Sequence, residues 1–343
     1  MATKSNKFEK TVISTRMRLA RNLDSYPFPS RQTEWQANEV ALLVRNALSH
    51  LDDGWKEFDM SAVGKSKAML LQEQHLISPA LVEKIGATAF VSADEKVSVM
   101  VNEEDHLREQ YIVKGFALSS AYERICSLDD GIGRFVNFAY DKKLGFLTAC
   151  PSNVGTGLRA SVMMFLPALE HKNAIAALVE RWSACGLTVR GVFGEGTAAE
   201  GYRYQISNDK TLGLSEEEIL EYMQEAIKEI ALAEEDARKE MVQTGGVELK
   251  DECLRAYGVL TNCAKIEYEE MRDLLTKVKL GVALGFFKIR KDDPYVLDAF
   301  IDEMRPYSFC EAHELFEVDQ LGRDCRRAEA LALMLPKLIE KVD

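Results

Sequence analysis

Apolar and polar residues alternate in several short stretches of the chain, and a period of two indicates β-strands. The stretches that predict strands are Lys67–Gln72, Val97–Asn102, Gly145–Ala149, Leu187–Phe193 and Arg203–Ser207. Elsewhere apolar residues recur every three or four positions, which is typical of helices. The stretches that predict helices are Trp35–Leu51, Ala160–Leu169 and Asn173–Cys185. The first part of the chain is therefore expected to mix helices with strands.

A long helix is predicted from Ser215, because Ser215 and Glu218 form a capping-box pattern ahead of regularly spaced apolar residues. The pattern breaks at residues 243–246, Gln-Thr-Gly-Gly. Beyond the break helical spacing dominates, in Glu267–Leu280, Pro294–Met304 and Arg326–Ile339. We therefore predict a mixed domain at residues 1–245 and a helical domain at residues 246–343.

Composition narrows the class of protein. The 343 residues are 47% hydrophobic and 29% charged, which excludes a disordered or collagen-like chain. No apolar run reaches the roughly 18 residues of a membrane span, and the polar start MATKSNKFEK lacks the apolar core of a signal peptide. Seven scattered cysteines without a Cys-x-x-Cys pair favour free thiols in a reducing compartment. We expect a cytoplasmic protein that does not contact the membrane.

The net charge of −12 argues against a nucleic-acid partner, but its distribution is uneven. Residues 215–240 contain 10 acidic and 3 basic residues, which is −7 in one predicted helix. Residues 1–50 contain 8 basic and 4 acidic residues, which is +4. The chain can therefore still offer a local site to an anion.

Two arginines mark the first candidate segment, Ser14-Thr-Arg-Met-Arg18. In a strand, Arg16 and Arg18 share one face, where their guanidinium groups repel each other unless an anion lies between them. A polyphosphate suits such a pair, because each planar guanidinium can bind two oxygens. A surface strand with spare arginines would give the same pattern.

Three further segments combine acids, glycines and arginines. Glu103, Glu104 and Asp105 precede His106 and Arg108, although an acidic first turn of a helix would look the same. Cys150 ends a predicted strand before a Gly-Thr-Gly loop, and a helix predicted to begin near Arg159 could cradle an anion with its N–H groups. In this setting the Cys150 thiol is a candidate for a lowered pKa.

The last segment runs from Arg190 to Gly201 and contains Glu195 among several glycines. Such a loop can close over a ligand, or it can be a simple flexible hairpin. Together the four segments supply about five arginines, at least two acids and one reactive cysteine, which is typical of phosphoryl transfer by positioning and charge neutralisation. Neither a Walker loop nor the protein-kinase motif set is present.

These four segments, in this order, resemble the guanidino-phosphotransferase family, over roughly residues 8–235. The closest resemblance is to its bacterial branch, the protein-arginine kinases of the McsB type. It rests on the runs Asn-Glu-Glu-Asp-His-Leu-Arg and Cys-Pro-Ser-Asn-Val-Gly-Thr-Gly-Leu-Arg-Ala. It implies an α+β fold in which helices flank a mainly antiparallel sheet, followed by an all-α C-terminal domain.

The resemblance also implies roles for individual residues. Arg108 and His75 would bind ATP, with His75 against the adenine. The other implied ATP-binding residues form three runs: Ser14, Thr15, Arg16, Met17 and Arg18; Arg159, Ala160, Ser161, Val162 and Met163; Arg190, Gly191, Val192, Phe193 and Gly194. Glu104 and Glu195 would grip the substrate guanidinium, with the Cys150 thiolate beside it. A carboxylate is needed there, because a protonated guanidinium has no lone pair to attack phosphorus.

Two features favour the bacterial branch. The small-molecule kinases carry a helical domain before the first arginine segment, whereas here that segment starts at residue 14, so an arginine on a protein could enter. The C-terminal run Arg-Asp-Cys-Arg-Arg-Ala also matches the phosphoarginine-binding motif of that branch. The implied allosteric residues are Arg323, Asp324, Arg326, Arg327 and Ala328, although a solvated helix face would show the same spacing.

The resemblance implies ATP and Mg²⁺ as cofactors, with no dedicated metal site in the protein. The implied partners are protein substrates, a zinc-finger activator, a stress-gene repressor and the Clp chaperone-protease, and a homodimer or higher homo-oligomer is expected. The implied function is ATP-dependent phosphorylation of protein arginines, which would mark proteins for Clp degradation and regulate the stress response. Two alternatives stay open: a kinase for free arginine or another small guanidino compound, and a non-catalytic adaptor that reads phosphoarginine.

Overall fold

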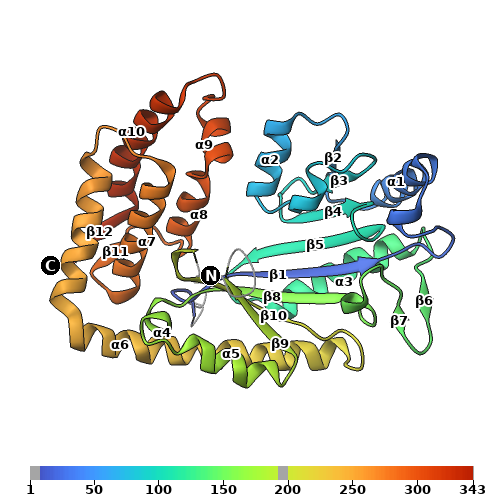
Figure 1. Cartoon of the computed structure of the whole chain (residues 1–343), viewed down its shortest axis with the longest axis horizontal. Coiled ribbons are helices and arrows are strands. Elements are labelled where there is room, and N and C mark those ends of the chain that lie inside the picture. The colour runs from blue at the N-terminus through green and yellow to red at the C-terminus, as the bar shows by residue number, and fades with distance from the viewer. Residues whose placement is uncertain (1–7, 192–199, 343) are drawn as a thin grey trace.

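An eight-stranded antiparallel sheet forms the centre of the molecule (Figure 1). The computed structural model describes residues 8–191 and 200–342. In spatial order the strands are β2 (Lys56–Asp59), β3 (Thr88–Val91), β4 (Val97–Val101), β5 (Leu107–Lys114), β1 (Val12–Arg21), β8 (Leu158–Phe165), β10 (Arg203–Asn208) and β9 (Leu187–Gly191). The antiparallel sheet and the predicted strands at β4, β9 and β10 are confirmed.

The two faces of this sheet differ in character. On β1 the side chains of Met17 and Leu19 are buried in the main apolar core, which includes helices α1 (Glu34–Leu48), α3 (Leu118–Gly133) and the first half of α6 (Glu216–Asn262). Arg16 and Arg18 alternate with them and project from the opposite face. The face that carries Met17 and Leu19 packs against helices and holds the sheet in place. The face that carries Arg16 and Arg18 is available for a polar site.

Two predicted elements have the wrong type. Lys67–Gln72 lies in helix α2 (Lys65–Glu73), where Ala68 and Leu71 share one buried side. Ala160–Leu169, predicted as a helix, is mostly strand β8, and a short helix α4 (Pro167–His171) begins only at the proline. Six of the eight residues of β8 are buried, and its nearly continuous apolar run cannot be told from a buried helix by periodicity.

The predicted strand Gly145–Ala149 is reduced to β7 (Gly145–Phe146), which pairs with β6 (Tyr140–Asp141) in a small separate hairpin. The predicted helices at Trp35–Leu51 and Asn173–Cys185 are confirmed as α1 and α5 (Ile175–Ser183). None of the helices in residues 8–191 and 200–342 combines the length and the hydropathy needed to cross a bilayer.

Helix α6 runs for 47 residues from the central sheet into the C-terminal region, and the capping box of Ser215 and Glu218 is confirmed at its start. It passes through the predicted domain boundary, where Gly245 departs from helical geometry (φ −137°, ψ 27°). Four further helices follow in the C-terminal region: α7 (Tyr268–Leu284), α8 (Val296–Glu303), α9 (Pro306–Ala312) and α10 (Gln320–Leu338). Of these, α7, α8 and α10 confirm the helices predicted at 267–280, 294–304 and 326–339. These helices surround a second apolar core, which confirms the prediction of a helical C-terminal region. The sequence did not predict the short antiparallel pair of β11 (Phe287–Ile289) and β12 (Ile339–Lys341) that accompanies them.

Candidate functional site

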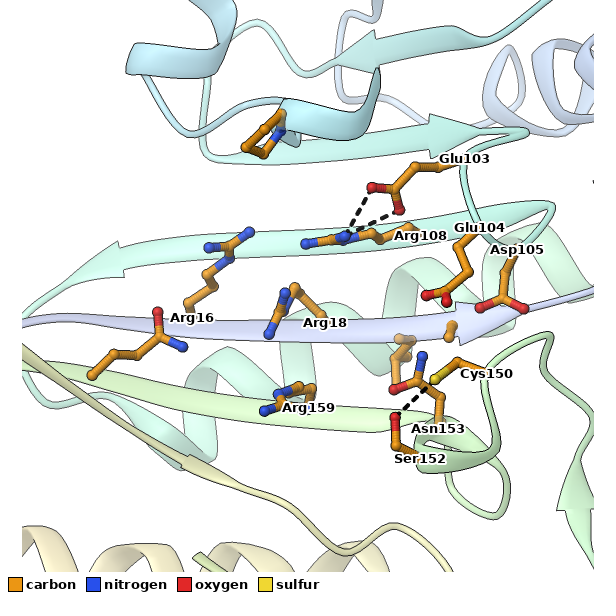
Figure 2. Close-up of a pocket in the computed structure, with 15 residues that line it drawn as sticks. Arg16, Arg18, Glu103, Glu104, Asp105, Arg108, Cys150, Ser152, Asn153 and Arg159 are labelled. Carbon is orange, nitrogen blue, oxygen red and sulfur yellow. Dashed lines mark hydrogen bonds and ion pairs between the residues drawn. The ribbon is translucent and has the colours of Figure 1, made fainter. Parts of the chain in front are cut away.

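Four arginines gather over the polar face of the sheet (Figure 2). Arg16 and Arg18 project from β1, and Arg159 on β8 pairs directly across from Arg18. Arg108 on β5 pairs with Ala20, one alternation away from Arg18 on the other side. The four side chains line one cavity of about 510 Å³. Three adjacent strands therefore bring together arginines that lie more than 140 positions apart at the extremes of the sequence.

The crowding of these cations is energetically unfavourable without an anion. Burial and the neighbouring Arg108 lower the pKa of Arg16 to about 9. The pKa of Arg18 is lowered well below its ordinary value by burial and by Arg16, Arg108 and Arg159. Within the described residues, the buried Nε atoms of Arg16 and Arg18 have no hydrogen-bond partner. A ligand with several anionic oxygens would relieve the repulsion and accept these hydrogen bonds.

The acidic run forms the turn between β4 and β5, not the first turn of a helix. Glu103 accepts two hydrogen bonds of 3.0 Å from Nη1 of Arg108 and a short one from Ser78. Asp105 accepts from Asn22 and, at 2.6 Å, from the backbone N–H of Ala149. The last bond ties the acidic turn to the segment that carries Cys150.

Glu104 is thereby held opposite Cys150 at one end of the cavity (Figure 2). Burial and the charges of Asp105 and Glu103 raise the pKa of the Glu104 carboxyl, while Arg108 and a hydrogen bond with Cys150 oppose the rise. The Cys150 sulfur also lies 3.0 Å from Oγ of Ser152. A carboxylate with a raised pKa beside a cation-lined cavity suits a group that accepts a proton.

Arg159 does not begin a helix, so the predicted cradle of helix N–H groups is wrong. The loop before it turns through Gly155 and Gly157, both with positive φ (114° and 66°), and leads directly into β8. A Cβ at Gly155 would overlap the carbonyl oxygen of Thr211, so only glycine allows this approach. The loop serves to place the Cys150 segment, and side chains supply the anion-binding groups.

His75 lies in a second cavity, of about 590 Å³, which shares Arg16 and Arg108 with the first. It follows α2 with a positive φ of 60°, and its carbonyl oxygen accepts a 2.6 Å hydrogen bond from Gln110 of β5. The ring is open to the cleft, yet the surrounding protein and the charges of Arg305 and Arg16 lower its pKa to about 4. The imidazole is therefore neutral at physiological pH.

The other implied nucleotide-binding residues divide by strand alternation. Ser14, Ser161 and Met163 share the polar side of the sheet with the arginines, but they do not line the arginine-rich cavity. Thr15, Met17, Ala160 and Val162 are buried on the opposite side. Thr15, for example, donates its hydroxyl to the carbonyl oxygen of Gly115.

Val192, Phe193, Gly194 and Glu195 lie outside the described residues, as does the side chain of Arg190. The backbone of Arg190 pairs with Gln205, which lines the arginine-rich cavity, and Gly191 pairs with Tyr204. This register brings β9, and with it the start of the predicted ligand loop, to the edge of the site.

The C-terminal arginine motif lies on α10, apart from both cavities. Asp324 and Arg327 are buried and form a 2.6 Å ion pair, and Arg327 also donates to the carbonyl oxygen of Ile266. Arg326 is exposed and paired with Glu329, and Ala328 is buried. Arg323 is half-buried, and its Nε has no hydrogen-bond partner among the described residues.

Two residues that shape the site, Glu103 and Arg305, were given no role from the sequence. Glu103 stands next to Glu104 in the same acidic run, so the run itself was the available signal. Arg305 contacts His75 from the C-terminal domain, 230 positions away, and nothing in its local sequence marks it. Among the described residues no group of three His, Cys, Asp or Glu side chains could hold a metal ion.

Family models match both parts of the chain. Residues 39–237 match the model described as ATP:guanido phosphotransferase, C-terminal catalytic domain. Residues 246–341 match the protein-arginine kinase McsB C-terminal domain. The chain is 39% identical over 331 residues to a protein-arginine kinase of Caldanaerobacter subterraneus subsp. tengcongensis, covering 95% of this chain and 97% of that one. It is 42% identical over 283 residues to a protein-arginine kinase of Geobacillus kaustophilus, covering 81% and 78%.

Solved structures of kinases for small guanidino compounds resemble about two thirds or more of this chain. A lombricine kinase superposes with a TM-score of 0.61 at 25% identity, covering 71% of this chain and 70% of that one. The duplicated taurocyamine kinase of Schistosoma mansoni, with bound transition-state-analogue components, gives 0.60 at 26% identity, covering 66% and 33%. The fold of this chain thus has counterparts in kinases of guanidino compounds.

Proposed function

The chain belongs to the ATP:guanido phosphotransferase family, and we propose that it transfers the γ-phosphoryl group of ATP to arginine side chains of proteins. It is a phosphotransferase that acts on a guanidino group. The observation that carries the proposal is the convergence of Arg16, Arg18, Arg108 and Arg159 beside Glu104 and Cys150. Identity of 39% over 95% of the chain to a protein-arginine kinase supports a protein as the acceptor.

The nucleotide is proposed to lie across the two connected cavities. The adenine would pack in the cavity of His75, and the phosphates would extend toward the arginines that both cavities share. The Nε atoms of Arg16 and Arg18 have no hydrogen-bond partner in the part of the chain that the structure describes, and we propose them as donors to phosphate oxygens. Phosphoryl transfer develops charge on oxygens in the transition state, and fixed guanidinium groups stabilise that charge.

At the other end of the cavity, Glu104 and Cys150 would hold the substrate guanidinium. A guanidino nitrogen forms a bond to the γ-phosphorus, the bond from that phosphorus to the bridging oxygen breaks, and ADP leaves with the electron pair. The guanidinium proton passes to the Glu104 carboxylate, whose raised pKa favours this acceptance. We assign the second carboxylate to Glu195 and the role of a thiolate that faces the cationic substrate to Cys150.

We propose that Mg²⁺ enters bound to the phosphate oxygens of ATP. Among the described residues no group of three potential ligands could hold a metal ion. Magnesium commonly binds substrate phosphates together with one or two carboxylates. Glu103 and Asp105 line the cavity in which such an ion would lie. When bound, the ion would neutralise phosphate charge alongside the arginines.

The C-terminal domain is proposed to carry a phosphoarginine-binding site at Arg323, Asp324, Arg326, Arg327 and Ala328, with the domain division at residue 245. Phosphoarginine would have to compete with the ion pair of Asp324 and Arg327. We also propose a homodimer or higher oligomer in the cytoplasm. As partners we propose a zinc-finger activator, a stress-gene repressor and the Clp chaperone-protease.

The proposal is tested by incubating the protein with ATP, Mg²⁺ and casein, followed by mass spectrometry under conditions that preserve phosphoarginine. Acid-labile phosphate on arginine, absent with the Glu104→Gln variant, is the expected result. Rapid turnover of free L-arginine without protein labelling would instead identify a small-molecule kinase. Phosphate confined to serine, threonine or tyrosine would exclude the proposed reaction.

A further inference from the structure

The C-terminal domain forms one wall of the cavity that contains His75. The catalytic domain contributes Arg16, His75, Arg108 and Arg203, and the opposite wall contains Arg272, Thr276 and Arg305 from α7 and from the turn before α9. In Figure 1, α9 lies beside α2 at this junction. The proposed nucleotide cleft is therefore completed by both domains.

Glu73, the last residue of α2, joins the two domains through its carboxylate. One of its oxygens accepts hydrogen bonds of 2.9 Å from the backbone N–H groups of Tyr307 and Ser308, and one of 3.2 Å from the Ser308 hydroxyl. The carboxylate thus satisfies free N–H groups in the first turn of α9. This contact fixes the start of α9 against the segment that leads directly to His75.

Arg305, immediately before α9, reaches His75 itself. Its Nη1 donates to the carbonyl oxygen of Glu73 and lies 3.1 Å from Nε2 of His75. A guanidinium can only donate hydrogen bonds, so Nε2 must accept and the ring proton must sit on Nδ1. Gln110 holds the backbone of the same histidine from the catalytic sheet. Orientation and tautomer of the imidazole are thus set from two domains.

The same arginine belongs to a chain of charges that reaches the other side of the cleft. Nη2 of Arg305 lies 2.9 Å from Asp302 of α8, and Asp302 lies 3.5 Å from Nη1 of Arg203. Asp298, one helical turn earlier, lies 3.4 Å from Nη2 of Arg203 and pairs with the buried Lys279. Arg203 is the first residue of β10 and lies eight positions after Glu195 in the sequence.

Close packing reinforces this second junction. Gly201, two positions before Arg203, has a φ of 62°, and a Cβ there would lie 2.9 Å from Oγ1 of Thr276 on α7. The segment from Gly201 to Arg203 therefore packs closely against the C-terminal domain. Both segments that flank the proposed nucleotide, the His75 turn and the start of β10, take their positions partly from that domain.

We propose that Arg305 is a positioning residue for the nucleotide, and that through Arg305, Asp302 and Asp298 the C-terminal domain sets the affinity of the catalytic domain for ATP. The inference rests on the proposed function insofar as the nucleotide occupies the cavity of His75. It adds a physical route by which an event in the C-terminal domain changes catalysis: a shift of α8 and α9 moves His75 and Arg203 together.

The test uses the full chain with Arg305→Ala, Arg305→Lys and Asp302→Asn, and Arg255→Ala as the matched control. Arg255 is an exposed arginine of the C-terminal half of α6 that forms an ion pair with Asp251 on the same helix. Calorimetry gives the Kd for ATP, and steady-state kinetics gives separate KM values for ATP and for the protein substrate. Thermal melting confirms that each variant is folded.

Arg305→Ala is expected to weaken ATP binding about tenfold and to raise the KM for ATP, while the KM for the protein substrate stays within twofold. Arg305→Lys and Asp302→Asn should give smaller losses, and Arg255→Ala none. Nitrogen-15 spectra of the His75 ring should show an unprotonated Nε2 in the parent and a mixture of tautomers in Arg305→Ala. A folded Arg305→Ala or Asp302→Asn variant with unchanged ATP affinity and an unchanged tautomer would overturn the inference. Because ATP binding is measured directly, a parent that binds ATP without forming phosphoarginine would contradict the proposed function alone.

Discussion

Arg18 and Arg159 occupy directly opposed positions on the neighbouring strands β1 and β8, so two guanidinium groups meet side by side on one face of the sheet. Like charges directly opposite each other in a sheet are destabilising, and here burial adds to the effect. In the proposed function, phosphate bound between the two arginines compensates for this loss of stability.

Replacing Arg18 by glutamine should separate these two effects. We expect the Kd for ATP to rise by about 10- to 100-fold, since a charge-assisted hydrogen bond contributes about 1.5–3 kcal/mol. Without ATP, the melting temperature of Arg18→Gln should equal or exceed that of the parent, because one of the crowded cations is gone. Arg45→Gln, at an exposed ion pair with Glu57, is the control and should leave ATP affinity unchanged. A lower melting temperature together with normal ATP binding would show that Arg18 is structural.

Glu104→Gln should strongly slow phosphoryl transfer while leaving nucleotide binding nearly unchanged. The amide keeps the size of the side chain but cannot accept the guanidinium proton, and general bases contribute about 10²–10⁴-fold to rate. We expect kcat to fall within that range while the Kd for ATP changes less than threefold. The control is Glu95→Gln, in the exposed turn between β3 and β4. Retention of more than a tenth of the parent kcat would exclude Glu104 as the base.

The pH dependence of kcat/KM should follow the ionisation of the Glu104 carboxyl group. Burial, Asp105 and Glu103 raise the pKa of Glu104 above its ordinary 4.5. A base must be ionised to act, so kcat/KM should rise with pH through this raised pKa and be lost as the pH falls below it. Asp105→Asn removes one repelling charge and should shift the acidic limb of the profile to lower pH. An acidic limb that does not move in this variant would assign it to another group.

Cys150 should be the thiol whose alkylation stops the reaction. It is half-exposed and lines the cavity beside Glu104. Iodoacetamide is expected to inactivate the parent, with a carboxamidomethyl group on Cys150, and a bound guanidino substrate should slow the inactivation. Cys185→Ala removes an exposed cysteine outside the cavity and should be inactivated like the parent. Inactivation of Cys150→Ala at the parent rate would point to a different thiol.

The loop that carries Cys150 depends on Gly155. Its φ is 114° and a Cβ there would overlap the backbone of Thr211, so Gly155→Ala combines backbone strain with a backbone clash. We expect a loss of at least about 3 kcal/mol in the free energy of unfolding, measured by urea denaturation. Gly213→Ala is the matched control, since Gly213 has a positive φ of 83° with nothing within 4 Å, and should lose about 1 kcal/mol. Equal losses in the two variants would mean that the close approach to Thr211 is unimportant.

Much of the fold was accessible from the sequence because its signals are local. The capping box of Ser215 and Glu218 predicts the start of α6, and alternation predicts that Arg16 and Arg18 share a face. The failures occur where local signals are ambiguous. The buried strand β8 reads like a helix, and the helix α2 is too short to display its period.

For the site, sequence patterns and family resemblance identify most residues but not their arrangement. The pairing of Arg18 with Arg159 depends on sheet order, and the acidic run with Glu104 becomes a hairpin turn only because β5 pairs with β4. Arg305 could not be identified from the sequence at all. Its contact with His75 exists only because the two domains pack against each other, and such a contact has no local sequence pattern. The roles of these residues in catalysis stay predictions.

Helix α6 gives the molecule a mechanical property of its own. It consists of two helical segments that meet at a bend at Gly245, one belonging to the catalytic domain and the other to the C-terminal domain (Figure 1). Bending is easiest at Gly245, where the helical geometry is already interrupted. A change of the bend angle at Gly245 would move the C-terminal domain relative to the catalytic domain. The contact between Arg305 and His75 would then open or close.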